Sequence, residues 1–328
     1  MRAGRLPLAV GLLLVAAGLA ALAVASFELG PDLMRPAYLC QAGSVAIAVA
    51  YTWALAARTG GRPIVFAGLA LAIGVAVILM DREVLTTGAA VATASVSAVL
   101  GVMATVPAVR VLQAAREVVI AVAIAGVGAL ATVGFEPSIS LLRFEYTTLA
   151  LALLGALGLV YRLGAGLHGL GRRGVVTVLV GSVLLAATLA YAELLRRYGT
   201  PSLVEWLFDG VRWSRANLGA FPRPLEAVLG IPALTWGVHM RARRRQGWWV
   251  CAFGVAATSP VATSLLNTTV TRTEAGLAVL YAVVVGLVIG NILIWLDLQF
   301  SGTRGRRATR AEQAAAVRPE PARTSPLL

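Results

Sequence analysis

The polar residues best placed to do chemistry in this chain lie inside or beside long apolar stretches. Two acids flank the longest polar gap, a threonine and a serine precede a proline in one apolar stretch, and an asparagine lies in another. Polar groups at membrane depth commonly contact a solute or ion, and a proline that frees a backbone carbonyl often marks such a site. We therefore predict a substrate site formed by Glu193, Glu226, Thr258, Ser259, Pro260 and Asn291.

Each of these residues also has a purely structural interpretation. An acid at the end of a membrane span is often only solvated at the headgroup level. Serine and threonine can satisfy the carbonyl that Pro260 frees, and Asn291 can hydrogen-bond a neighbouring helix. In either case Pro260 is expected to interrupt its helix, because proline removes one helical hydrogen bond.

The small numbers of reactive residues exclude other kinds of chemistry. His168 and His239 have no cysteine or carboxylate cluster beside them, so no metal site is predicted. Gly164, Gly166 and Gly169 have the spacing of a dinucleotide-binding loop, but they lie between two apolar stretches instead of a strand and a helix. A glycine-rich loop beside arginines can at most receive an anion. We predict no catalytic residue and no cofactor.

Ten stretches of the chain are long and apolar enough, or nearly so, to cross a membrane, since about 20 residues span roughly 30 Å of hydrocarbon. Hydrophobic residues make up 59% of the chain, and none of these stretches carries a charge near its middle. The sequence therefore predicts an all-α polytopic integral membrane protein, with a bundle of about ten transmembrane helices in residues 1–297. The predicted spans are Leu6–Phe27, Ala37–Ala57, Ile64–Met80, Ala89–Val109, Val118–Phe135, Thr147–Tyr161, Val175–Ala192, Leu225–Met240, Trp248–Leu266 and Leu277–Leu296.

The arginines between these stretches predict how the chain is threaded. All 28 basic residues are arginines, and 19 of them fall in the inner gaps and ends if the N-terminus is inside. Inner loops of membrane proteins are enriched in arginine and lysine, so both termini are predicted to be cytoplasmic. Lysine-free, alanine-rich composition is typical of a GC-rich bacterial genome, and we expect the protein in the cell membrane. The first stretch could instead be a cleaved signal peptide, which leaves the remaining topology unchanged.

An amphipathic helix is predicted in the outer segment 193–224. Ser202 and Glu205 have the spacing of a capping box at its start. Apolar and charged residues then fall on opposite faces, with Trp206 and Trp213 together on the flank between them. We expect this helix to rest on the outer leaflet with both tryptophans in contact with lipid. The sharper alternative is a lid over an outward-facing cavity.

Arginines also gather just inside the membrane. Arg241, Arg243, Arg244 and Arg245 directly follow a span and are expected to contact anionic lipid of the inner leaflet. Residues 298–328 are basic and poor in apolar side chains, which predicts a disordered cytoplasmic tail. Topology accounts for the basic charge, so no nucleic-acid partner is predicted. Membrane lipids are the expected partners, and a membrane-protein partner is left open.

A bundle with short loops leaves room mainly for a cavity within the membrane, so the first functional hypothesis is a transporter or flippase of a small or lipid-linked solute. Ten spans with both ends inside resemble the topology of drug/metabolite transporters, whose two halves are inverted repeats. Residues Leu6–Phe135 and Thr147–Leu296 show no such repeat, so the chain is not assigned to that class. The alternatives are a membrane-embedded transferase acting on a lipid-linked substrate at the outer face, and a non-catalytic partner in envelope assembly.

Overall fold

The computed structural model describes residues 5–26, 37–80, 82–165, 167–243, 246–301 and 320–327, and these ranges contain helices and no strand. Eight helical segments within them are long and apolar enough to cross a membrane. Their apolar side chains must be buried in lipid or against one another, and a helix satisfies its own backbone. The protein is thus a helical, multi-pass membrane protein.

Six of these segments lie in single α-helices, and two are composite. The single helices are α1 (Arg5–Ser26), α2 (Ala37–Arg58), α3 (Pro63–Met80), α4 (Glu83–Met103), α5 (Val111–Val133) and α12 (Arg272–Ser301). The segment Leu141–Leu163 consists of α6 (Leu141–Val160) and the start of the π-helical turn η2 (Tyr161–Ala165). The segment Gly247–Leu266 consists of α10 (Gly247–Ala252), α11 (Val255–Thr263) and the 3-10 turn η4 (Ser264–Leu266).

Two further predicted spans have helical but less regular counterparts. The helix α7 (Leu167–Tyr198) follows η2 and contains a shorter apolar stretch, Val178–Tyr191. The π-helical turn η3 (Leu225–Gly230) runs directly into α9 (Ile231–Arg241). Each is helical where the sequence predicts a span, but among the described residues neither has an apolar stretch as long as those of the other eight.

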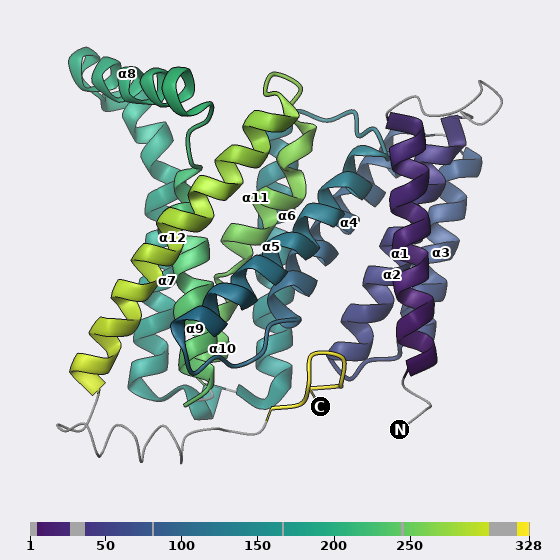
Figure 1. Ribbon diagram of the computed structural model, residues 1–328, viewed down its shortest axis with the longest axis horizontal. Coiled ribbons are helices and arrows are strands. Elements are labelled where there is room, and N and C mark those ends of the chain that lie inside the picture. The colour runs from purple at the N-terminus through teal and green to yellow at the C-terminus, as the bar shows by residue number, and fades with distance from the viewer. Residues whose placement is uncertain are drawn as a thin grey trace.

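The bundle has two distinct ends (Figure 1). The first helix begins at one end, and residues Glu320–Leu327 lie there too; we call it the terminal end. Helix α8 (Pro201–Leu218) lies across the opposite end, which we call the α8 end. The expected amphipathic helix is therefore present, although its N-cap is Thr200, whose side chain makes no capping hydrogen bond.

The C-terminal part of helix α8 is bonded to α12. Arg215 forms an ion pair with Glu274 at 3.1 Å, and the Tyr281 hydroxyl donates to the Leu218 carbonyl at 2.7 Å. Gly219 then takes a left-handed conformation, with φ of 78°, which ends the helix at no steric cost. Trp206 and Trp213 remain mostly exposed, as contact with lipid requires.

The composite segment Gly247–Leu266 is the centre of the bundle. Buried residues make up 83% of its apolar stretch, against 11% in α1 and in α3. Within the segment, α11 packs on α4, α5 and α6. The predicted interruption at Pro260 is wrong, because α11 continues through that residue. The break lies instead at Phe253 and Gly254, where the backbone N–H groups bond to carbonyls three residues back. Gly254 favours a break because glycine is a poor helix former.

The helices of the two halves pack differently. In the first half α4 packs along α5, whereas in the second half α12 packs along α9 and η3. This difference agrees with the lack of similarity between the halves in the sequence.

A pair of glycines brings α12 against α9. A Cβ at Gly286 would lie 2.6 Å from Ile231 Cβ, and one at Gly290 would lie 2.7 Å from Thr235 Cβ. The spacing of these glycines, four residues, is that of a small-residue helix contact. Gly276, in the same helix, faces open space: no described atom outside its own helix would lie within 4 Å of a Cβ added there.

Substitution of Gly290 by leucine should therefore destabilise the protein by about 1–3 kcal/mol, because the added side chain meets Thr235 in a packed interface. The thermal unfolding midpoint of the purified protein measures this effect. Gly276→Leu is the matched control and should leave the midpoint unchanged or slightly raised. Equal midpoints for the two variants would mean that α12 does not pack on α9 through this face.

The structure describes two parts of the predicted tail, residues 298–301 and 320–327. Helix α12 continues to Ser301, and Glu320–Leu327, here called the C-terminal segment, is held against the bundle by hydrogen bonds and by packing of Leu327 on the core. Polar contacts supply much of this attachment, so the low hydrophobicity of the tail did not reveal it. Residues 302–319 lie outside the described residues.

Candidate functional site

Glu226 is a deeply buried acid near the α8 end. It lies in the first turn of η3, its side chain is fully buried, and neither carboxylate oxygen has a hydrogen-bond partner among the described residues. Arg223 supplies a positive charge beside it, with Nη1 3.6 Å from Oε1. The same Nη1 donates to the Pro260 carbonyl at 2.8 Å. Arg223 thus joins two residues that the sequence predicted for the substrate site, Glu226 and Pro260.

Helix α6 adds two further polar residues to this region. Glu145 is close enough to interact electrostatically with both Arg223 and Glu226. Thr148 lies almost one turn further along α6 and is fully buried, and within the described parts of the chain its hydroxyl has no hydrogen-bond partner. We call Glu145, Arg223, Glu226 and the Pro260 carbonyl the Glu226 site, and Thr148 lies three residues after Glu145 of this site on α6. The site contains two acids and one arginine.

A buried carboxylate that accepts no hydrogen bond is costly, and a protein retains one mainly where it has a function. The Glu226 oxygens have free acceptor capacity toward the described residues, and the Thr148 hydroxyl can both donate and accept. A ligand that brings a positive charge or N–H donors would satisfy these groups. Chemically, the arrangement can receive a cation or a cationic group, and a proton is the smallest such ligand.

The other predicted substrate-site residues do not join Glu226 in this way. The Thr258 hydroxyl donates to the Ala98 carbonyl at 2.8 Å, so it bonds α11 to α4, and Ser259 is buried beside it. Asn291 lies exposed on α12. Glu193 lies in α7, but its side chain is outside the described residues.

The site predicted from the sequence did not include Arg223 or Glu145. In the sequence Arg223 and Glu145 look like ordinary residues at span ends, where charges are common. A signal was present for Arg223, because it lies three residues before Glu226 and helical spacing brings such pairs together. No signal in the sequence places α6 beside η3.

The second polar cluster is at the terminal end and contains Arg241. This residue was expected to contact lipid headgroups, but its side chain is fully buried. It lies over the Trp248 ring at 3.5 Å from the centroid and donates to the Thr105 hydroxyl at 2.7 Å. Arg241 is the last residue of α9, whose residues near this end are also buried. Arg243 is half-buried, and Arg244 and Arg245 lie outside the described residues.

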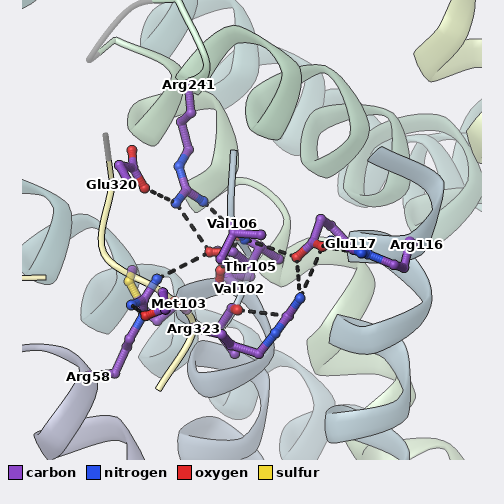
Figure 2. Close-up of polar contacts among 12 residues, drawn as sticks. Arg58, Val102, Met103, Thr105, Val106, Arg116, Glu117, Arg241, Glu320 and Arg323 are labelled. Carbon is purple, nitrogen blue, oxygen red and sulfur yellow. Dashed lines mark hydrogen bonds and ion pairs between the residues drawn. The ribbon is translucent and has the colours of Figure 1, made fainter. Parts of the chain in front are cut away.

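Figure 2 shows how the C-terminal segment meets this cluster. Glu320 accepts from Arg241 at 2.6 Å, and Arg323 donates to both oxygens of Glu117 at 3.0 and 2.9 Å. Arg58, at the end of α2, donates to the carbonyls of Ala322 and Ser325. The segment therefore ties together three helices, α2, α5 and α9.

Comparison with known proteins gives no match to this chain: no family model, no curated protein and no solved structure is significantly similar. What the protein does must therefore be inferred from the chemistry of the two clusters.

Proposed function

We propose that the protein is a transporter of a small cationic solute, with the Glu226 site as its binding site. The observation that supports this most is the fully buried Glu226 carboxylate, whose oxygens have no hydrogen-bond donor in the described part of the chain. Ionisable groups inside a membrane bundle commonly lie on solute or ion pathways. With both acids ionised, the site holds one more negative charge than positive charge, and this favours a cation.

Two features of the neighbouring helices support the same proposal. The Pro260 carbonyl of the Glu226 site belongs to α11, and the segment that contains α11 is interrupted at Phe253 and Gly254. Glu226 lies in a π-helical turn, and such turns are frequent at functional sites. Discontinuous helices beside a buried polar site are common in transporters.

We further propose that the bundle crosses the membrane ten times and that the terminal end faces the cytoplasm. The less regular segments α7 and η3–α9 would supply the ninth and tenth crossings. The arginine distribution supports the orientation, because the gaps at the terminal end hold most of the arginines.

Flipping of a lipid-linked solute is a second candidate, favoured by an apolar hollow of about 250 Å³ beside η3. Its walls include Val228 and Leu229, which closely follow Glu226, and Trp236, whose indole N–H has no hydrogen-bond partner among the described residues. An acyl chain fits such a surface, while its polar headgroup would lie at the Glu226 site.

Accessibility of the Glu226 site from both sides of the membrane tests transport without knowledge of the substrate. The variant Cys40→Ala/Cys251→Ala/Thr148→Cys carries a single thiol on α6, three residues after Glu145 of the site. In oriented vesicles, we expect a membrane-impermeant maleimide to label this thiol from either side, because a transporter exposes its site alternately. An enzyme at the outer face or a docking partner would be labelled from the α8 end alone, or not at all.

Thr132→Cys in the same background is the matched control. Thr132 is equally buried, but its hydroxyl is satisfied by the Gly128 carbonyl within α5. This thiol should resist labelling from both sides. Labelling of the Thr148→Cys thiol from one side only would contradict the proposal of transport.

A further inference from the structure

Arg241 depends on the C-terminal segment for its negative partner. Its guanidinium is fully buried, and Glu320 is the one carboxylate that contacts it among the described residues. The Nε atom of Arg241 is buried and finds no hydrogen-bond partner in the described ranges. Without Glu320, a buried positive charge would remain with the Thr105 oxygens and the Trp248 ring. Such a charge strongly attracts an anion.

The guanidinium group of Arg58 lies beside that of Arg241. Both guanidinium groups approach the Thr105 carbonyl, Arg241 at 3.2 Å and Arg58 at 3.5 Å, so they lie side by side. The Nη1 atom of Arg58 donates to the carbonyls of Ala322 and Ser325 in the C-terminal segment, at 2.7 and 2.6 Å. If the C-terminal segment dissociates from the bundle, N–H donors of Arg58 and Arg241 face the space that it leaves.

Glu117 does not need the segment in this way. When Arg323 leaves, its carboxylate keeps Arg116 at 3.0 Å and the Val106 N–H at 2.9 Å. Removal of the segment therefore leaves the acid of the cluster satisfied and the two buried arginines without their C-terminal acceptors. The remaining surface selects for a negatively charged ligand.

We propose that Arg58, Arg241 and Thr105 form a binding site for a phosphate or carboxylate group, and that Glu320 occupies it as a built-in ligand. Two guanidinium groups and a hydroxyl are a donor set that matches the oxygens of such an anion. An external anion and the Glu320 carboxylate compete for this site. Anion binding here does not depend on whether the Glu226 site transports a solute.

Inorganic phosphate is the first probe, applied to the full-length protein in a zwitterionic phosphatidylcholine nanodisc. In the Glu320→Gln variant the built-in ligand is neutral, so phosphate at about ten times its dissociation constant should raise the thermal unfolding midpoint by roughly 2–4 °C. Sulfate or chloride at equal ionic strength corrects for general salt effects. The unaltered protein should respond less, because Glu320 competes.

Two further variants make the result specific. Glu312→Gln makes the same chemical change elsewhere in the tail and should behave as the unaltered protein. Arg323→Gln frees the segment from Glu117 without changing the proposed site, and it should increase the phosphate response. If neither Glu320→Gln nor Arg323→Gln responds to phosphate, and anionic lipid does not stabilise Glu320→Gln either, the proposal is overturned and the segment serves only to hold the helices together.

The source of the anion is distinguished by the lipid. If Glu320→Gln is stabilised when phosphatidylglycerol replaces phosphatidylcholine, and added phosphate then has no further effect, the ligand is a lipid headgroup. If only soluble phosphate stabilises the variant, the ligand comes from the aqueous phase. Both outcomes support an anion site, and a failure of both overturns it.

Discussion

Replacing Arg223 by glutamine should destabilise the protein by about 3 kcal/mol, since it leaves the buried Glu226 carboxylate without its positive neighbour. The substitution also removes the hydrogen bond to the Pro260 carbonyl. The thermal unfolding midpoints of the single and double variants measure the coupling. Glu226→Gln should cost less than Arg223→Gln, because an amide is neutral and needs no counter-charge.

The double variant Arg223→Gln/Glu226→Gln decides the cause. If the cost of Arg223→Gln comes from the stranded carboxylate, the second change should recover much of it. Additive effects of the two changes would show that the pair at 3.6 Å is not an interacting unit. In that case the Glu226 site would lose its electrostatic basis.

Replacing Arg241 by glutamine should have the largest effect of any single change at the terminal end, a loss of about 3–5 kcal/mol. It removes the contact with the Trp248 ring and the bonds to Thr105, and it leaves Glu320 without its partner. The midpoint of thermal unfolding again measures the loss. Arg243→Gln is the matched control, because Arg243 is half-buried two residues later, and it should change the midpoint little.

If Arg241→Gln and Arg243→Gln behave alike, Arg241 acts as a general inner charge and the buried cluster has no special role. That result would also remove the basis for an anion site at Arg58 and Arg241. A large effect of Arg241→Gln alone supports the cluster but not the anion site, which the phosphate measurement tests separately.

The membrane character and the outer helix could be predicted because they depend on local patterns. Apolar length predicts a span whatever its neighbours are, and the alternation of faces in Pro201–Leu218 predicts α8. The four-residue spacing of Gly286 and Gly290 is likewise a local pattern, and these two glycines lie against α9 in the structure. Each of these features is encoded within about one element.

The two polar clusters could not be predicted because their members come from distant parts of the chain. Arg241 and Glu320 are 79 residues apart, and Arg323 and Glu117 are 206 apart. Arg241 looks like the three arginines that follow it, and only the register of α9 decides that it is buried. For the same reason Glu226 was predicted as a candidate, but its relation to Arg223 and Glu145 was not.

The break in the central segment shows how tertiary contacts change a local expectation. Pro260 is a stronger helix breaker than Gly254, yet α11 continues through Pro260 and the helices separate before Val255. The carbonyl that Pro260 leaves without its helical donor is that of Ala256. Arg223 and Thr263 donate instead to the carbonyl of Pro260 itself, which fixes α11 at this point to a side chain from outside the segment. A sequence pattern cannot show a donor such as Arg223, which comes from another element.

The most direct test of transport is whether the two ends of the bundle open in alternation. The Sγ atom of Cys251 is buried 4.0 Å from Nη1 of Arg241, so labelling of this thiol reports on access from the terminal end. Labelling of the Thr148→Cys thiol reports on access from the α8 end. Two proteins are compared, and each carries only one of these thiols. Release of the C-terminal segment by Arg323→Gln should raise labelling of Cys251 from the terminal end. The same change should lower labelling of the Thr148→Cys thiol from the α8 end. If Cys251 labelling rises while the other thiol is unaffected, the ends open independently and the proposal of a transporter is contradicted.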